Sequence, residues 1–181
     1  MIINGIFIPV LSYQLKLLYP DLNLDEVEIE VDEDGNERIV KFPEGITLPT
    51  QEQLDSVYLL ALKEWKAQEI KEECAKRLAR LLEDISEEEV ETFWIQVMEA
   101  KEYQKDPNAF TPFIDTLAGT RGISKDELVQ RIIAKANAYS QMAAKLLGIQ
   151  QRLLDYLFSD SCNTEELIVS VKWEESTSNE G

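Results

Sequence analysis

Hydrophobic residues recur at helical spacing along two long stretches of the chain. The first stretch runs from residue 50 to Leu82 without a glycine or proline, and the second runs from Lys125 to Phe158. The pattern predicts two long helices, the first roughly 50 Å long at a rise of 1.5 Å per residue. Gly148 is the weak point of the second helix, since glycine costs about 1 kcal/mol relative to alanine inside a helix.

Capping boxes mark the expected helix starts, because a Ser or Thr is followed three residues later by Glu or Gln. The three pairs are Thr50 with Gln53, Ser86 with Glu89, and Ser124 with Glu127. The second pair predicts a helix of medium length that stops at residues 106–108. Thr111 and Pro112 then predict a short helix over residues 113–118 that ends at Gly119.

Two runs near the N-terminus predict a β-hairpin. Val27–Val31 alternates strictly between apolar and polar residues, Arg38–Phe42 is a second β-like run, and residues 34–36 between them have turn chemistry. The hairpin would have one apolar face and needs something to pack on. The helix predicted over Val10–Tyr19 is the nearest candidate.

The segment Leu167–Trp173 is apolar, rich in β-branched residues and strand-like. A single strand cannot satisfy its own backbone groups. Three alternatives follow: it completes a small sheet with the hairpin, it docks on the helices, or it pairs with a partner protein.

These elements predict a mainly α fold of the α+β class. A small N-terminal unit, helix plus acidic hairpin, would occupy residues 1–49, a long helical bundle or helical hairpin residues 50–158, and an acidic tail residues 159–181. The strand-like segment would lie in that tail. The chain is long enough for one ordinary domain with an appendage.

The net charge of −17 narrows the choice of partners. Ten acids and three bases lie in residues 1–49, nineteen and fourteen in residues 50–158, and six and one in residues 159–181. No basic stripe exists, so direct binding to nucleic acid or to anionic lipid is disfavoured. The acidity favours solubility, a basic partner or mimicry of DNA.

Catalytic and metal-binding motifs are missing from the sequence. The chain has no histidine, which removes histidine-based triads, HExxH zinc sites and ExxH di-iron sites. Phosphate-binding glycine motifs are also missing, and in residues 32–35 the glycine comes too early for a calcium loop. We therefore expect no enzyme activity, no cofactor and no metal.

The compartment is expected to be intracellular. No apolar run approaches the length of a membrane span, and the N-terminus lacks the features of a secretory signal. Cys74 and Cys162 lie far apart without metal-type spacing, so both are expected to be free thiols in a reducing environment.

Residues 109–158 resemble a segment of phage and prophage proteins from the tail-fibre region. The family pattern is a TPF block, an LAxxRG turn, an ELxxR helix start and a later KAxxY. The matching residues are Thr111, Pro112, Phe113, Asp115, Leu117, Ala118, Arg121, Gly122, Glu127, Leu128, Lys135, Ala136, Tyr139 and Gly148. The cap and turn chemistry of these residues also gives them a purely structural interpretation.

The upstream region resembles XkdW-like prophage proteins and the N-terminal part of tail fibre assembly proteins. The resemblance rests on the acidic hairpin, the apolar proline link and the LPTQEQL segment. It implies a tail fibre assembly chaperone that binds and solubilises the phage tail fibre protein during trimerisation in the host bacterial cytoplasm. The acidic C-terminal tail departs from the family pattern.

Two apolar surfaces are the candidates for binding that partner, by addition of a strand. The residues are Val27, Ile29, Val31, Ile39, Val40 and Phe42 of the hairpin, and Leu167, Ile168, Val169, Val171 and Trp173 of the tail. The helices could also form a homo-oligomer. Two other functions stay open: a structural adaptor retained in the virion tail or fibre, and an acidic inhibitor that mimics DNA.

Overall fold

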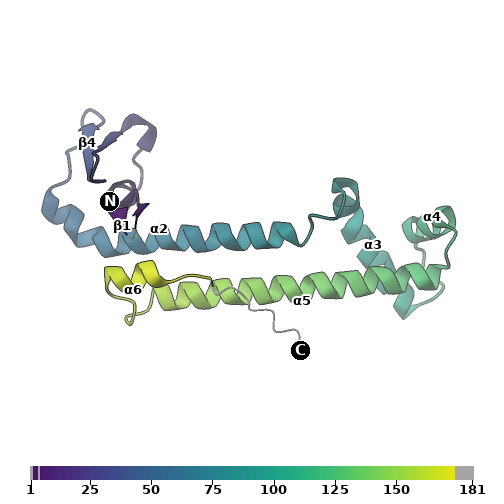
Figure 1. Cartoon of the computed structure of the whole chain (residues 1–181). Coiled ribbons are helices and arrows are strands. Elements are labelled where there is room, and N and C mark those ends of the chain that lie inside the picture. The colour runs from purple at the N-terminus through teal and green to yellow at the C-terminus, as the bar shows by residue number, and fades with distance from the viewer. Residues whose placement is uncertain (1, 4, 174–181) are drawn as a thin grey trace. The chain divides into compact units, whose positions relative to one another are not determined.

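The computed structural model describes residues 2–3 and 5–173, and in this part the chain is mainly helical with small antiparallel sheets, which confirms the expected fold class (Figure 1). The helices are α1 (Val10–Leu18), the 3-10 turn η1 (Leu24–Glu26), α2 (Gln51–Arg80), α3 (Glu87–Lys105), α4 (Pro112–Arg121), α5 (Lys125–Leu157) and α6 (Glu165–Ser170). The strands are β1 (Ile2–Ile3), β2 (Ile6–Phe7), β3 (Glu28–Val31) and β4 (Glu37–Lys41).

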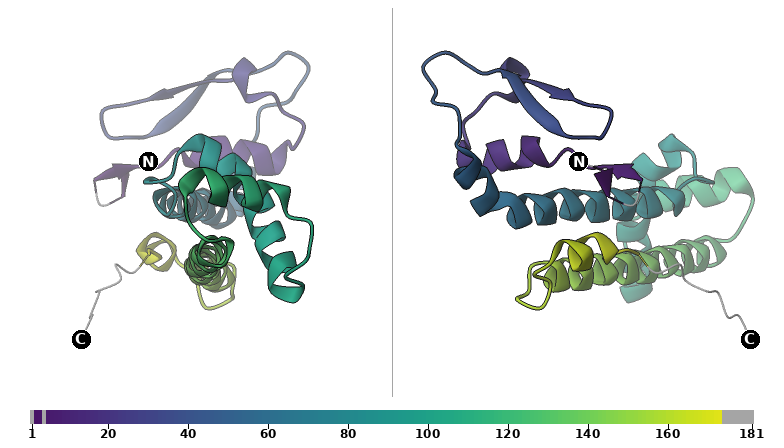
Figure 2. Two further views of the ribbon diagram at one scale, coloured as in Figure 1. Left: turned by 90° about the vertical axis from the view of Figure 1, so that its right-hand side faces the viewer. Right: turned by 60° about the vertical axis from the view of Figure 1, so that its left-hand side comes forward.

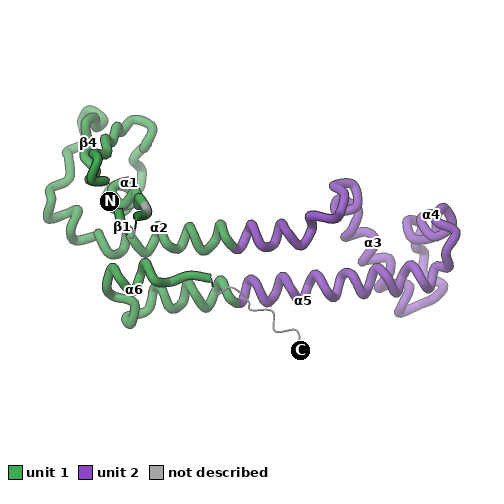
Figure 3. Tube along the Cα trace, in the orientation of Figure 1, with its two compact units in different colours: residues 1–73, 149–181 green, residues 74–148 purple. Residues whose placement is uncertain are grey.

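Two compact units share these elements (Figure 3). Unit 1 comprises residues 1–73 and 149–181, and unit 2 comprises residues 74–148. Both unit boundaries fall inside long helices, α2 and α5, and not at the expected breaks near residues 49 and 158. Unit 1 is therefore built from both ends of the chain.

The predicted hairpin and its packing on the first helix are confirmed. β3 and β4 pair antiparallel, with Ile29 opposite Ile39, and an irregularity between Glu28 and Ile29. Leu11 and Leu15 of α1, together with Leu22, form the buried core on which the hairpin packs. Figure 2 shows α1 lying between the hairpin and the N-terminal part of α2.

Polar contacts fix α1 to both of its neighbours. The backbone amide of Leu11 donates to the Glu37 carboxylate of β4 at 3.2 Å, so the hairpin caps the start of the helix. The buried Gln14 donates through Nε2 to the carbonyl of Leu54 in α2 at 2.8 Å. A second, shorter hairpin, β1–β2, was not predicted; Gly5 lies between its strands with φ of 80°.

The capping box at Thr50 forms as predicted, whereas Ser86 and Ser124 form only the serine half of the box. The side chains of Glu89 and Glu127 pair with Lys135 and Arg131 instead. The amide of Gln53 donates to Thr50 Oγ1 at 3.2 Å, and the amide of Thr50 donates back to Gln53 Oε1 at 2.9 Å. Ser86 and Ser124 likewise accept from the amides three residues later, at 3.2 and 3.1 Å. These local signals place the starts of α2, α3 and α5.

The short helix α4 is longer than expected. It continues through Gly119 to Arg121 and ends at Gly122, whose φ of 65° lies in the left-handed region. The amide of Gly122 donates back to the last turn, and the amide of Ile123 donates to Ala118 at 3.2 Å. The stop at Gly119 was wrong because Gly122 has the conformation that ends a helix.

The expected C-terminal strand is also wrong, because residues 165–170 form the helix α6. The side chain of Thr164 accepts from the amide of Leu167 at 3.3 Å, and two glutamates occupy the first turn. A capping threonine followed by acids starts a helix in spite of the β-branched residues behind it. Of the three alternatives for this segment, docking on the helices is the one that the structure contains.

The core of unit 2 lies where α3, α4 and α5 meet. Its buried residues are Ala100, Ile114, Ala118, Leu128, Val129 and Ile132. Val97, Tyr103, Leu117, Ile123 and Ile133 pack around them. This core holds α3 with one face inward and leaves its other face exposed.

Candidate protein-binding groove

Unit 2 contains a groove with an almost entirely apolar lining and a volume of about 340 Å³. It lies among the turn after α2, the first turns of α3 and the middle of α5. Its lining residues are Leu81, Leu82, Ile85, Val90, Phe93, Lys135, Ala138, Tyr139 and Met142. A volume in this range suits one or two large apolar side chains of a partner.

The end of α2 and the start of α3 form one wall of the groove. After Arg80 the chain continues in successive turns, with the amides of Leu81 and Leu82 donating three residues back at 3.1 and 3.0 Å. Ser86 then caps α3. Ile85 stands before the cap and Val90 stands after it, the arrangement of a hydrophobic staple, and both line the groove.

Acidic residues are interleaved with the apolar residues of that wall. They are all exposed: Glu83, Asp84, Glu87, Glu88, Glu89 and Glu91. Three of them lie in the first turn of α3, where negative charge is favourable. Hydrogen bonds from its own backbone amide and from the Ser86 hydroxyl lower the pKa of Glu88, which lies in this wall.

The opposite wall, on α5, is basic. No Asp or Glu occurs in residues 128–148, whereas Arg131, Lys135 and Lys145 do. Lys135 Nζ lies 2.5 Å from Glu89 Oε1, and this ion pair joins the two walls. The groove therefore combines an apolar floor with acidic residues on the α3 side and Lys135 on the α5 side, a surface that suits an amphipathic protein segment.

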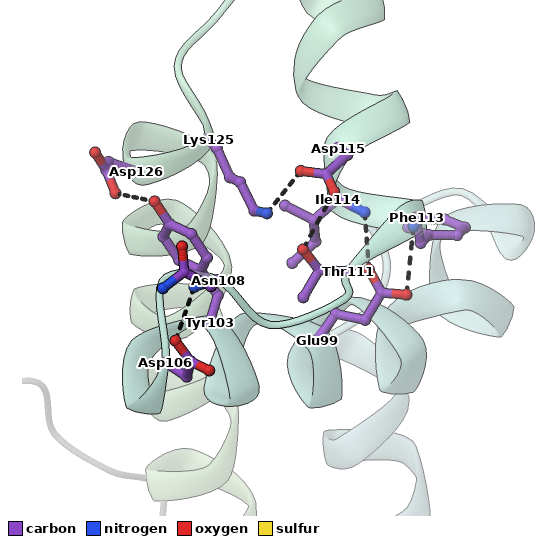
Figure 4. Close-up of polar contacts among 10 residues, drawn as sticks. All are labelled: Glu99, Tyr103, Asp106, Asn108, Thr111, Phe113, Ile114, Asp115, Lys125 and Asp126. Atoms are coloured by element: carbon purple, nitrogen blue, oxygen red, sulfur yellow. Dashed lines mark hydrogen bonds and ion pairs between the residues drawn. The ribbon is translucent and has the colours of Figure 1, made fainter.

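The residues of the tail-fibre resemblance that surround α4 make structural contacts. Figure 4 shows Glu99 reaching from α3 to the start of α4, where its carboxylate accepts from the amides of Phe113 at 3.3 Å and Ile114 at 3.0 Å. Thr111 precedes the helix, is fully buried, and makes no side-chain cap. Glu99 thus supplies from another helix the acceptor that Thr111 does not provide.

A second polar chain fixes the start of α5 (Figure 4). Lys125 Nζ lies 2.7 Å from Asp115 Oδ1 and 4.5 Å from the ring centroid of Tyr103. The Tyr103 hydroxyl donates to Asp126 Oδ1 at 2.8 Å. That hydrogen bond, with a smaller contribution from burial, raises the pKa of Tyr103. These contacts position α3, α4 and α5 around the core of unit 2.

A shallower depression lies between α3 and α4. Its lining residues are Ile95, Glu99, Pro112, Phe113, Thr116, Leu117 and Thr120, and its volume is about 570 Å³. Glu99 is already engaged with the amides of α4. We therefore treat the depression as part of the surface of α3 and not as a separate polar site.

The hairpin residues expected to bind a partner divide into two groups. Val27, Ile29, Ile39 and Phe42 are half-buried against α1, and the Phe42 ring meets Tyr19 edge-on at a centroid distance of 5.9 Å. Val31 and Val40 are exposed, at 48% and 43%. Most of the apolar face is thus used inside unit 1, and two valines remain accessible.

The C-terminal residues expected to bind a partner are mostly buried inside unit 1. Ile168, Val171 and Trp173 are buried, Val169 is half-buried, and Leu167 is exposed. The Trp173 indole donates to the carbonyl of Ile70 in α2 at 3.2 Å. Strand addition through this segment would require α6 to unfold.

The groove residues were not singled out from the sequence as a site. Leu81, Leu82, Phe93 and Tyr139 belong to apolar stripes of the predicted helices, which indicate a core. One feature of the sequence could have identified the groove. Apolar residues are dense in the segment 81–93, and acidic residues fill most of the positions between them. Sequence periodicity alone does not tell which part of a stripe stays uncovered.

Little in the described residues indicates reactive chemistry. Across residues 2–3 and 5–173, no group of three or more His, Cys, Asp or Glu side chains is placed to hold a metal ion. Cys74 and Cys162 are both buried and free, and burial raises the pKa of each thiol. Within the same residues, no helix has the length and apolar character needed to cross a membrane.

Comparison with known proteins yields no relative. No protein-family model matches the chain, and neither a curated protein nor a solved structure matches it. The groove and the contacts around it are therefore the basis for assigning a function.

Proposed function

We propose that this chain is a non-catalytic binding protein and that its partner docks in the apolar groove of unit 2. The observation that carries the proposal is the groove itself. Every lining residue except Lys135 is apolar or aromatic, and Lys135 is held by Glu89 at the rim. A concave apolar surface with charged rims is typical of sites that hold an apolar anchor of another protein.

The partner we propose is a phage tail fibre protein, with this chain as its assembly chaperone. The resemblance of residues 109–158 to tail-fibre-region proteins supports this choice, and the segment contributes Lys135 and Tyr139 to the groove. Fibre chains expose apolar surface and strand edges before they trimerise, and both favour aggregation. This chain, with its net charge of −17, would cover part of the exposed surface of the fibre protein and keep the complex soluble.

The hairpin offers a second contact. The sheet of β3 and β4 has two strands, and Val31 and Val40 are exposed on it. An added strand from the fibre protein would pair with the free edge of either strand. The groove would hold an apolar anchor while the hairpin edge accepts a strand. In this role the protein works in the host cytoplasm and leaves before the particle is complete.

Co-expression with the product of the adjacent fibre gene tests the proposal. We expect soluble, trimeric fibre only when this chain is present. Ala138→Trp fills the groove and should lower the yield of soluble fibre severalfold. Ala144→Trp, at an exposed position elsewhere on α5, is the matched control and should leave the yield unchanged. Fibre that is equally soluble and trimeric without this chain would refute the chaperone role.

Purified virions separate the chaperone from the adaptor. Mass spectrometry of the particles should not detect a chaperone, whereas an adaptor would be present in a fixed ratio to the fibre. If the chain copurifies with virions and the Ala138→Trp variant does not, the groove binds a structural partner and the adaptor function replaces the chaperone function.

A further inference from the structure

One face of α3 remains exposed although its sequence is apolar at the centre. Val90, Trp94 and Met98 follow one another at intervals of four residues, and their side chains are 38%, 61% and 57% exposed. The opposite face carries the buried Gln96 and Ala100. At 100° per residue the three exposed side chains fall within one narrow stripe of the helix. Scattered apolar residues are ordinary on a surface, but a Trp, a Met and a Val in one stripe form a patch.

Charged residues extend the same stripe at both ends. Glu87 lies one turn before Val90, and Lys101 lies one turn after Met98. Both fall on the face that carries Trp94. The N-terminal end of the stripe is therefore acidic and its C-terminal end basic, with apolar residues between them. We name Glu87, Val90, Trp94, Met98 and Lys101 the α3 stripe.

This order of residues is self-complementary in an antiparallel arrangement. If two copies of α3 cross with Trp94 at the two-fold axis, Val90 of one copy faces Met98 of the other. Glu87 of one copy then faces Lys101 of the other, and this pair occurs twice. The helix dipoles are also antiparallel, which is the favourable orientation. A parallel arrangement would instead place Glu87 against Glu87 and Lys101 against Lys101.

We propose that two copies of this chain associate through the α3 stripe in an antiparallel, two-fold symmetric dimer. A two-fold interface uses the same patch on both copies, as this stripe requires. The two Trp94 rings form the centre, where tryptophan commonly contributes most to binding. The order of charged and apolar residues identifies the partner as a second copy of this chain. An unrelated protein would not present acidic, apolar and basic residues in the reverse order of the stripe.

The dimer should be weak to moderate in affinity. α3 has 19 residues, and one helix pair of this length buries less than the ~1,200 Å² of a stable interface. We therefore expect a Kd of roughly 1–100 μM. The stripe shares Val90 with the lining of the groove and Glu87 with its acidic wall, but the proposal does not depend on the identity of the fibre partner.

Sedimentation velocity of the full chain from 1 to 300 μM measures the association. We expect a concentration-dependent shift from monomer to dimer. Trp94→Ala should weaken dimerisation at least tenfold. Leu147→Ala removes an exposed apolar side chain of α5 that is 44% exposed, and it should change nothing. Far-UV circular dichroism checks that each variant keeps its helix content. A chain that stays monomeric at 300 μM overturns the proposal.

A charge exchange tests the antiparallel register. Glu87→Lys and Lys101→Glu should each weaken the dimer, and the double variant should restore it, because both pairs are then reversed. Failure of the double variant to restore it would overturn the register.

Cysteine crosslinking gives a second measurement of the register. Trp94→Cys should form a disulfide with itself across the two-fold axis. A mixture of Val90→Cys and Met98→Cys should crosslink faster than either variant alone. The native Cys74 and Cys162 are almost fully buried and should not interfere. A different result would refute the dimer: Trp94→Cys does not crosslink, and Trp94→Ala abolishes fibre binding without changing the association of the chain. The stripe would then bind a different protein.

Discussion

The Tyr58 hydroxyl donates a hydrogen bond to the Glu165 carboxylate at 2.7 Å, and these residues are 107 positions apart in the sequence. The bond joins α2 to α6 within unit 1. Lys63 Nζ donates to the carbonyl of Ser159 at 3.4 Å, and Trp173 donates to Ile70, so α2 is joined to residues 159–173 at three points. The C-terminal segment is thus part of the folded unit.

Tyr58→Phe should lower stability and change its dependence on pH. Burial, and then the hydrogen bond to Glu165, raise the pKa of Tyr58 above 10.0. The unfolded chain releases the phenolic proton near pH 10 and the folded chain retains it, so the contribution is present below pH 10 and is lost as pH rises further. Urea unfolding at pH 8 should show a loss of about 1 kcal/mol in Tyr58→Phe.

The same unfolding series between pH 9 and 11 measures the pH effect. The free energy of unfolding of the wild type should fall with pH, and that of Tyr58→Phe should fall less steeply. Equal slopes for the two proteins would show that the Tyr58 proton is not held by the fold.

Substitutions in α6 should separate a docked helix from a free binding segment. Ile168 is fully buried, whereas its neighbour Leu167 is 37% exposed. Ile168→Ala should lower the free energy of unfolding by about 2–5 kcal/mol because it leaves a cavity. Leu167→Ala should cost less than about 1 kcal/mol. Chemical denaturation measures both, and equal small losses would mean that α6 is not packed in solution.

Removing the cap that Glu99 provides should loosen α4. Glu99→Ala takes away the acceptor for the amides of Phe113 and Ile114, and we expect a cost of about 1–2 kcal/mol. Glu99→Gln keeps one oxygen and should cost less. Hydrogen exchange at the two amides is the direct measurement. Glu102→Gln, at an exposed position of the same helix, is the control and should leave their exchange unchanged.

The two glycines of the LAGTRG segment should respond to alanine with opposite signs. Gly119 lies inside α4 with no atom near the position of an added Cβ, so Gly119→Ala should stabilise by about 0.5–1 kcal/mol. Gly122 has φ of 65°, so Gly122→Ala should destabilise by about 1 kcal/mol. Thermal unfolding of both variants tests this. A helix that ended at Gly119 would give the reverse order.

Features set by local chemistry were predictable from the sequence, and α6 shows where this fails. The caps at Thr50, Ser86 and Ser124 place three helix starts because cap and amide are three residues apart. Leu167–Trp173 is rich in β-branched residues and predicts a strand, yet Thr164 caps a helix there and Ile168 is buried in the packed unit. The apolar spacing of this short segment fits either structure, and long-range packing decides between them.

The candidate groove depends on long-range packing for the same reason. Periodicity identifies Phe93 and Tyr139 as members of apolar stripes, but whether another element covers them is decided by residues distant in sequence. The hairpin shows the converse case. Its apolar face was predicted, and α1 covers Val27, Ile29, Ile39 and Phe42, which leaves only Val31 and Val40 accessible.

The composition of unit 1 from both ends of the chain has a consequence during translation. The carbonyl of Ile70 accepts a hydrogen bond from the indole of Trp173, which is synthesised 103 residues later. At 5–20 residues per second, the ribosome needs roughly 5–20 s to synthesise that interval. Residues 74–148 are complete 25 residues earlier, roughly 1–5 s at the same rate, while the buried face of α2 stays uncovered. Until Trp173 is in place the nascent chain is itself exposed to aggregation, and unit 1 is completed only after residues 165–173 have left the ribosome.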